Sequence, residues 1–300
     1  MKLTLTNKDG AVLDLLGNPK YFVLTKTSNF HGIDTDIITS ESPYLDGSIV
    51  DHVKANPRGI SMAFALVPEI RRSIDFFTSF VKSKQWVKIT ETENGATKEI
   101  EGIATLNPFS RMESLCKIEL SVYCGQPYWQ DAKEIASEIS MYIALLHFPA
   151  TIGQYFTAVN GKKGGRVFSV INTSAERTLV NDGDTSVGMI IHATALGGIS
   201  NPRISCSSGE QNGWYMQVNV DMKDNDELEI CTIRGQKYIT INGAITYNGV
   251  ALLSLLEFVG DDWLQLETGK NVFNIGSYTG GKLVTIDKLY FTIVYRRKYQ

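Results

Sequence analysis

Short runs of alternating apolar and polar residues fill much of the first part of the chain. The clearest run is CKIELSVY at 116–123, where the apolar side chains at 118, 120 and 122 alternate with polar ones. Alternation with a period of two is typical of a strand that buries one face. The runs at 21–24 and 59–66 are rich in apolar and aromatic residues and also predict strands.

Two further strand-like runs, 86–92 and 97–103, lie on either side of Glu93-Asn94-Gly95-Ala96. An Asn-Gly pair readily adopts the positive φ angles of a tight turn. The sequence therefore predicts a β-hairpin over residues 86–103.

Apolar residues recur at helical spacing in two segments. In 68–83 they fall at 70, 74, 77 and 81, with Pro68 suited to the first turn and Lys82 to the end. In 131–146 they fall at 135, 139, 142, 143 and 146. Both patterns predict helices, and packing against a sheet explains such a stripe better than a cofactor site does.

The second half of the chain contains short strands separated by frequent turn signals, which is typical of a β-sandwich. The pattern of apolar and turn residues changes after Phe148-Pro149, so we predict two domains, at 1–148 and 149–300. The strands expected in the second domain lie at 187–194, 214–220, 227–234, 237–241, 271–275 and 289–295.

Composition narrows the possible partners. The formal net charge of -3 and the absence of a strong basic cluster give no electrostatic basis for holding nucleic acid or an anionic membrane. The uncharged stretch at 139–161 is broken by His147, Pro149 and Gly153, so it does not predict a membrane span. No apolar run of signal-peptide length opens the chain, and we expect its four cysteines to be reduced.

No known catalytic or cofactor motif occurs. The chain has no G-x-S-x-G, no H-E-x-x-H and no Walker loop, and its histidines and cysteines are scattered rather than spaced for zinc. The run at 161–166, GKKGGR, leads into a strand-like segment and reads as a basic turn. We therefore predict no catalytic residue, cofactor or metal.

Some carboxylates and tryptophans leave other functions open. Asp182 and Asp184 are compatible with the start of a calcium loop, but the pattern fails after the second aspartate and a turn explains it better. Trp214 and Trp263 would suit a carbohydrate-binding protein if they were exposed, although core or rim packing is favoured. A glycan hydrolase would need two carboxylates across a groove, and pairs such as Asp261-Asp262 do not establish one.

The order of these features resembles the distal tail proteins, or Dit proteins, of long-tailed bacteriophages. One stretch that carries the resemblance ends an apolar strand with Cys124 and the run Pro127-Tyr128-Trp129, and another contains Asn181-Asp-Gly-Asp184. The complete set of similar segments is 46–52 leading into 58–64, 116–129, 180–184, 226–243, 269–275 and 290–297.

The resemblance implies a mainly β (α+β) protein with a structural role. It implies an N-terminal belt domain with a helix and an extended hairpin, followed by a galectin-like β-sandwich. Six copies are then expected to form a ring with a central channel for DNA at the distal end of the virion tail, assembled in the host cytoplasm. The implied partners are the tail tube protein, a tail-tip protein and a receptor-binding protein. A carbohydrate-binding sandwich is the alternative.

Under this resemblance, the hairpin at 86–103 is a candidate contact between neighbouring subunits of the ring. A closed ring needs two different, complementary surfaces on each subunit, and an edge strand offers unpaired backbone groups to a neighbour. The candidate interface residues are Trp86, Lys88, Thr90, Lys98, Ile100 and Ile103.

The stretch that contains Asp182 and Asp184 then becomes the turn that starts the outer sandwich. We predict that residues 187, 189 and 191 face its core, whereas 188, 190 and His192 lie on the other face.

Overall fold

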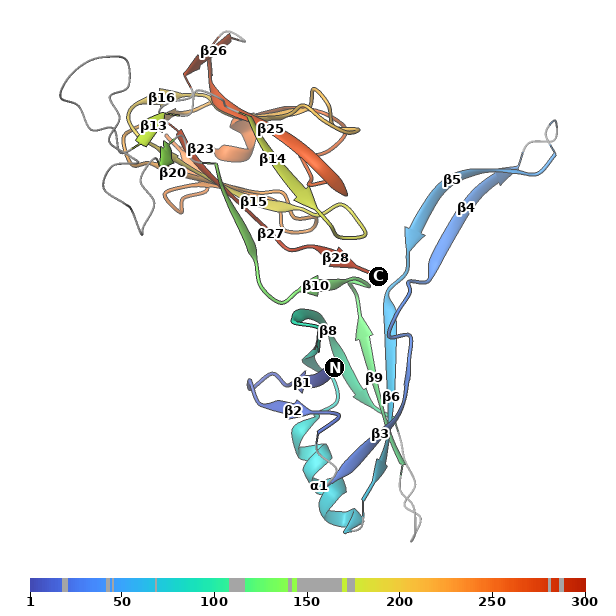
Figure 1. Ribbon diagram of the computed structural model, residues 1–300. Coiled ribbons are helices and arrows are strands. Elements are labelled where there is room, and N and C mark those ends of the chain that lie inside the picture. Colours follow the sequence, from blue (N-terminus) through green and yellow to red (C-terminus); the bar gives the residue numbers. More distant parts are fainter. Residues whose placement is uncertain are drawn as a thin grey trace, which may run out of the picture. The chain divides into compact units, whose positions relative to one another are not determined.

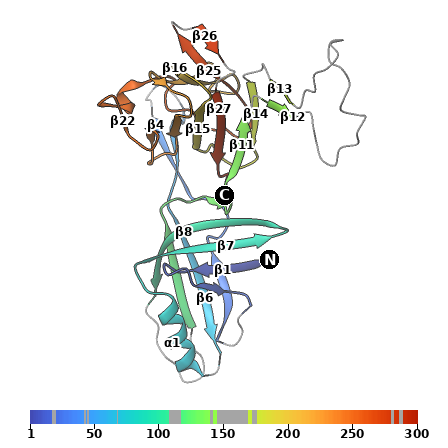
Figure 2. The ribbon, with the colours of Figure 1, turned by 90° about the vertical axis from the view of Figure 1, so that its left-hand side faces the viewer.

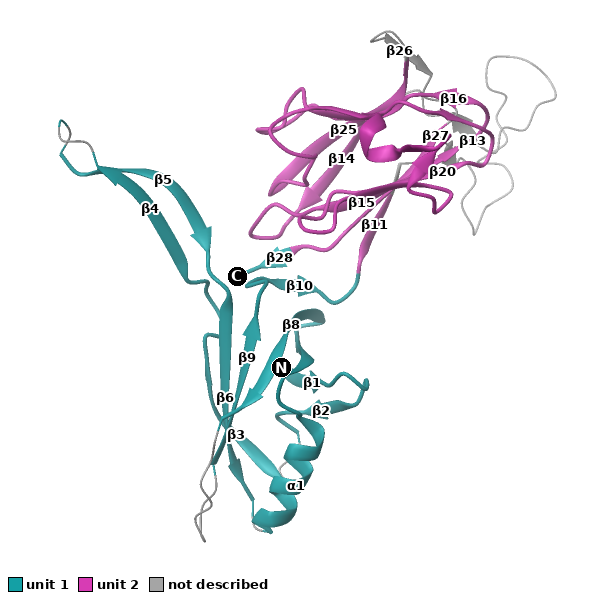
Figure 3. Cartoon of the chain, turned by 180° about the vertical axis from the view of Figure 1, so that it is seen from behind, with its two compact units in different colours: residues 1–133, 298–300 teal, residues 134–297 magenta. Residues whose placement is uncertain are grey.

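The chain folds into two compact units, shown in Figures 1 and 3. The computed structural model describes residues 1–17, 21–41, 44, 46–67, 69–107, 117–139, 142–144, 169–171, 176–279, 282–285 and 289–300. The first unit contains residues 1–133 and 298–300, and the second contains 134–297. The sequence placed the boundary at 148/149, whereas the units divide at 133/134 and the last three residues return to the first unit.

The first unit is built on one antiparallel sheet. Its strands are β1 (Lys2–Thr6), β2 (Val12–Asp14), β3 (Phe22–Ser28), β6 (Arg58–Leu66), β7 (Gln85–Glu93), β8 (Ala96–Leu106), β9 (Lys117–Cys124), β10 (Trp129–Asp131) and β28 (Lys298–Tyr299). The order is β2-β1-β7-β8-β9-β6-β3, and β10 pairs with both β8 and β28. The predicted alternation in β9 is confirmed, because residues 118, 120 and 122 are buried.

Helix α1 (Ile70–Phe80) covers the buried face of this sheet and lies within the helix predicted at 68–83 (Figure 2). Phe77 is fully buried, with its ring centroid 5.5 Å from that of Phe22 and 4.9 Å from that of Phe64. One aromatic cluster therefore joins the helix to β3 and β6.

A separate two-stranded hairpin, which we call the arm, projects from the first unit between β3 and β6 (Figure 1). It consists of β4 (Thr35–Glu41) and β5 (Ser48–Ala55). Every residue of the two strands is exposed except Ala55, which is half-buried. The residue pattern had not predicted these strands.

The second unit consists of two sheets that share one hydrophobic core. The five-stranded sheet has the order β11-β27-β15-β20-β21, with β11 (Ile135–Ile139), β15 (Met189–Ala195), β20 (Glu227–Cys231), β21 (Tyr238–Ile241) and β27 (Leu289–Tyr295). The six-stranded sheet has β14 (Glu176–Asn181), β17 (Pro202–Cys206), β18 (Tyr215–Val218), β24 (Leu256–Val259), β25 (Gly269–Thr279) and β26 (Lys282–Thr285). Ile191 and Phe291 enter the core from the first sheet, and Ile204 and Phe273 from the second.

Three short pairs and one 3₁₀ turn complete the described elements of the second unit. They are β12 (Tyr142–Ala144) with β13 (Ser169–Ile171), β16 (Ile199–Ser200) with β19 (Asp221–Met222), β22 (Thr246–Tyr247) with β23 (Val250–Ala251), and η2 (Leu252–Leu255). Strands occur in all six segments predicted for the sandwich, and the mainly β fold class is confirmed.

The helix predicted at 131–146 is wrong, because the described part of this segment forms strands β10, β11 and β12. All five residues of β11 pair with β27, from Ile135 opposite Tyr295 to Ile139 opposite Phe291. Residues four apart share a face in a strand as well as in a helix, so the stripe did not distinguish the two. Cys116, the Phe148-Pro149 boundary and the turn at 161–166 lie outside the described residues.

The stretch around Asp182 is a turn. The side-chain amide of Asn181 donates to the carbonyl oxygens of Thr185 (3.0 Å) and Leu266 (3.1 Å), and its oxygen accepts from the backbone N–H of Gly183 (3.0 Å). Asp182 lies at the surface, 3.7 Å from Arg297. The predicted alternation also holds, because 187, 189 and 191 are buried whereas 188, 190 and 192 are half-exposed.

Gly188 lies too close to a neighbouring backbone segment to carry a side chain. A Cβ at this position would lie 2.4 Å from the Cα of Ile233, so the two backbones approach too closely for a side chain. We expect Gly188→Ala to lower the free energy of unfolding of the second unit by about 1–3 kcal/mol in urea titrations. Gly198→Ala is the matched control, because a Cβ there meets no atom within 4 Å. Equal stability of the two variants would contradict this packing.

Candidate functional sites

The hairpin predicted at 86–103 exists as β7 and β8, but it does not lie at a sheet edge. The two strands pair from Gln85 opposite Ala104 to Glu93 opposite Ala96, and Asn94 and Gly95 adopt the positive φ angles expected for the turn. On either side β7 pairs with β1, and β8 pairs with β9 and β10. The argument that this hairpin offers a free edge to a neighbour therefore does not hold.

The structure separates the six candidate interface residues onto two faces. Trp86 opposite Ile103, Lys88 and Thr90 share the outer face of the hairpin. The other two residues lie on the opposite face: Ile100 is a core residue with 3% exposure, and Lys98 places its ammonium 3.8 Å from the ring centroid of Tyr299.

Lys88 is already paired within the chain. Its ammonium lies 3.2 Å from a carboxylate oxygen of Glu99 and 3.1 Å from one of Glu101. Burial lowers the pKa of Lys88, but its hydrogen bonds to Glu101 and Glu99 outweigh burial and raise the pKa above its ordinary value. Lys88 is therefore a charged member of a local network.

The sequence did not reveal that Tyr123 lies beside these residues. Tyr123 on β9 lies opposite Ile103, so Trp86, Ile103 and Tyr123 form a row across three strands. Trp86 and Tyr123 are each more than half exposed. The alternation in 116–123 contained the signal, because it places residue 123 on the same outward face as 117, 119 and 121.

The arm exposes a larger apolar surface than the hairpin does. Ile37 lies opposite Val53 and Thr39 opposite Val50, with a register shift after Ile38, so these side chains share one face. Ile37, Val50 and Val53, which we call the apolar face of the arm, are 61%, 57% and 53% exposed. An isolated two-stranded hairpin is marginally stable in water, and an uncovered apolar surface of this kind marks an interaction site.

The base of the arm is fixed by a buried arginine. Arg58 donates to the carbonyl oxygens of Phe30 (2.9 Å) and Gly32 (2.7 Å), and the indole N–H of Trp129 also donates to Phe30 (3.0 Å). Burial lowers the pKa of Arg58 from its ordinary value. These bonds hold the segment that leads into β4 against the start of β6, so the arm begins from a rigid base.

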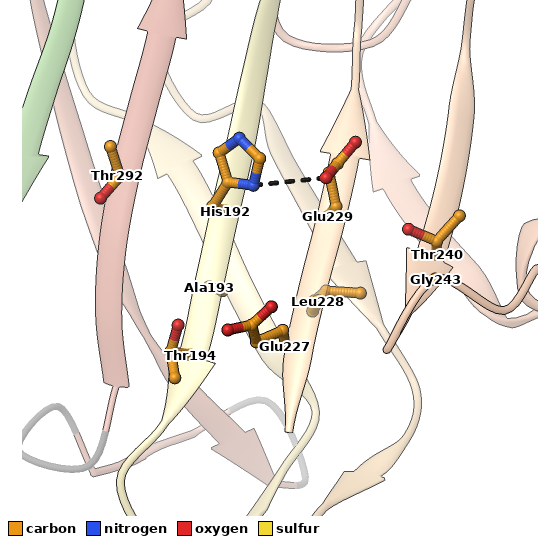
Figure 4. A pocket seen from close by; sticks show the side chains of 9 residues that line it. All are labelled: His192, Ala193, Thr194, Glu227, Leu228, Glu229, Thr240, Gly243 and Thr292. Atoms are coloured by element: carbon orange, nitrogen blue, oxygen red, sulfur yellow. Dashed lines mark ion pairs between the residues drawn. The ribbon is translucent and has the colours of Figure 1, made fainter. Parts of the chain in front are cut away.

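A polar hollow of about 330 Å³ lies on the second unit (Figure 4). Its lining comes from β15, β20, β21 and β27 of the five-stranded sheet and from the turn after β21. The nine lining residues are His192, Ala193, Thr194, Glu227, Leu228, Glu229, Thr240, Gly243 and Thr292.

Glu229 is the most constrained polar group in the hollow. One of its carboxylate oxygens lies 3.4 Å from Nδ1 of His192, and the other accepts a hydrogen bond from the hydroxyl of Tyr238. This hydrogen bond to Glu229 raises the pKa of Tyr238 to about 12. His192 thus lies on a sheet face, as predicted, and has a carboxylate neighbour that the sequence did not reveal.

The tryptophans considered for sugar stacking belong to the core. Trp263 is 8% exposed, and Trp214 packs against the same hydrophobic cluster, with Gly260 directly against its ring. Core or rim packing was the favoured interpretation: Trp263 is a core residue, and Trp214 is half-buried at the rim of the core. Asp262, a member of the candidate carboxylate pair, forms ion pairs with Lys237 and Arg234.

The described ranges lack two kinds of functional element. Within them, no three His, Cys, Asp or Glu side chains are grouped so that they could hold a metal ion. No helix in this part of the chain is long and apolar enough to cross a membrane.

Residues 182–299, which are less than half of the chain, match the C-terminal domain of the siphovirus-type tail component family. The match covers most of the second unit, including both strands that contribute most to the hollow, β15 and β20.

The fold of the whole chain is similar to that of the SPP1 Dit protein, described as a paradigm of the hub adsorption apparatus in phages that infect Gram-positive bacteria. The TM-score is 0.62 at 13% sequence identity, and the alignment covers 99% of each chain. A chain of the phage P2 baseplate in its activated conformation with Ca aligns with a TM-score of 0.43 at 10% identity, over 98% of this chain and 97% of that one. No curated protein matches the sequence. The resemblance to the Dit family is confirmed.

Proposed function

We propose that this protein is the hub of a phage or phage-like tail. Six copies close into a ring that joins the tail tube to the tip or baseplate and anchors receptor-binding proteins. DNA passes through the central channel of this ring. The match of residues 182–299 to the tail component family and the likeness of the whole fold to a hub protein support this role.

The apolar face of the arm is the observation that carries the proposal. A ring of identical subunits needs a surface on each copy that fits a different surface on the next copy. Ile37, Val50 and Val53 present three β-branched side chains to solvent, and among the described residues the two strands of the arm pair only with each other. A neighbouring copy of the protein is the partner that would cover this surface in a ring.

The second surface is proposed to lie on the outer face of the sheet in the first unit. There Trp86, Ile103 and Tyr123 form the exposed row described above. Aromatic side chains are enriched where interfaces contribute most of their binding energy. This assignment keeps Trp86 and Ile103 as candidate contacts and leaves Ile100 in the core.

Assembly in solution tests the hub. We expect light scattering on the purified chain to give a mass of about 200 kDa, which is six times 33.3 kDa, in the concentration range where the ring forms. Electron-microscopy class averages should show six-fold particles with a central opening. A chain that stays monomeric at every concentration and does not bind a tail tube protein would overturn the proposal.

A further inference from the structure

The polar hollow on the second unit has a geometry that a ring-forming role does not require. Thr292, His192, Glu229 and Thr240 lie opposite one another in a single row across four neighbouring strands. Because strands are about 4.8 Å apart, the row spans about 14 Å. Thr194 and Glu227 form the adjacent row, two residues further along the same strands.

The side chains of this surface are held in place before any ligand arrives. All of them project from paired strands, which position groups more firmly than loops do. Glu229 is fixed further by its contacts with His192 and the Tyr238 hydroxyl. Figure 4 shows the imidazole of His192 between Thr292 and the carboxylate of Glu229, with Thr194 and Glu227 further along the same strands. Such an arrangement loses little side-chain entropy on binding.

The chemistry of the lining selects the class of ligand. Hydroxyls of Thr194, Thr240 and Thr292 each can donate and accept a hydrogen bond, and none has a partner among the described residues. The nine lining residues include no lysine or arginine, so two carboxylates are left to repel an anion. The two apolar side chains, Ala193 and Leu228, are buried in the core. A hydrophobic ligand would therefore gain nothing here.

Two classes remain, a neutral polyhydroxylated molecule and a cation. Both oxygens of Glu229 already have partners, which leaves Glu227 as the carboxylate that a cation would meet. Three available hydroxyls that both donate and accept match the mixed donors and acceptors of a sugar better than they match an ammonium group, which only donates.

We propose that this hollow, bounded by β15, β20, β21 and β27, is a binding site for a neutral saccharide. Glu227 accepts hydrogen bonds from sugar hydroxyls, and the three threonines donate and accept. None of the nine lining residues is Trp, Tyr or Phe, the side chains that stack on sugar rings, so we expect a dissociation constant on the order of millimolar.

Saturation-transfer NMR on the full chain tests the site with three matched probes. N-acetylglucosamine is neutral, glucosamine carries an ammonium group, and glucuronic acid carries a carboxylate. Methyl glucoside and methyl galactoside extend the neutral set. We expect transfer to at least one neutral sugar and none to glucuronic acid. In the double variant Thr194→Val and Thr292→Val, which loses two hydrogen bonds, binding should weaken by about tenfold.

Thr178→Val is the control, because it makes the same change at an exposed position of β14 in the other sheet. It should bind as the unmodified chain does. The proposal is overturned if no neutral sugar shows transfer, or if the double variant binds as tightly as the control. It is also overturned if only glucosamine binds and Glu227→Gln abolishes that binding, which would assign the hollow to a cation. Light scattering on each variant reports ring assembly separately, so failure of one proposal is distinguishable from failure of the other.

Discussion

Val53→Asp is expected to leave the protein monomeric under conditions where the unmodified chain forms rings. The substitution places a carboxylate in the middle of the apolar face of the arm, between Ile37 and Val50. A charge that loses water without gaining a partner costs several kcal/mol, which exceeds what a contact of this kind contributes. Light scattering at matched concentrations measures the assembly, and circular dichroism shows that the chain still folds.

His52→Asp is the matched control for this prediction. His52 is exposed on the same strand one residue away, and it lies opposite Ile38 on the other face of the arm. Both variants add one aspartate to the same hairpin, so a general effect of charge would appear in both. Rings in the Val53→Asp variant, or loss of rings in both variants, would show that the apolar face is not the contact.

Phe77→Ala is expected to lower the free energy of unfolding of the first unit by about 3–5 kcal/mol. Phe77 is fully buried and contacts Phe22 edge-on and Phe64 at a tilted angle. Removing the ring opens a cavity where α1 meets the sheet and takes away the contact that joins the helix to β3 and β6. Urea denaturation followed by circular dichroism measures the loss.

Phe76→Ala is the matched control, because it also removes an aromatic ring from α1 but from a position outside the buried cluster. Phe76 is half-buried and stacks on Tyr21, with ring centroids 4.4 Å apart. We expect its loss to cost about 1 kcal/mol, the usual strength of such a pair. In both variants the urea concentration at which half of the second unit is unfolded should equal that of the unmodified chain. Equal destabilisation by the two substitutions would contradict the central role of Phe77.

Local patterns in the sequence predicted those elements whose residues carry a clear period. The stripe at 70, 74, 77 and 81 predicted α1, and Asn94-Gly95 predicted the turn of the β7–β8 hairpin. The arm escaped prediction because its apolar residues come in adjacent pairs, Ile37 with Ile38 and Ile49 with Val50, which fit no period.

The order of strands in a sheet was beyond the reach of local patterns. Nothing within 86–103 shows that residues 2–6 and 117–124 flank it, yet this decides that the hairpin is central rather than an edge. The hollow has the same origin. His192 was correctly placed on a sheet face, but Glu229 and Thr292 reach it from strands 37 and 100 residues away, through pairing that only the fold supplies.

The path of the chain makes the second unit an insertion within the first. The polypeptide leaves the first unit after residue 133 and returns at 298, where β28 pairs with β10. The two ends of the insertion are neighbours, since Ile135 lies opposite Tyr295 and Arg296 forms an ion pair with Glu134 at 3.3 Å. Domains with adjacent ends are readily inserted into a host fold. A replacement for the second unit would therefore have to match only one pair of adjacent chain ends.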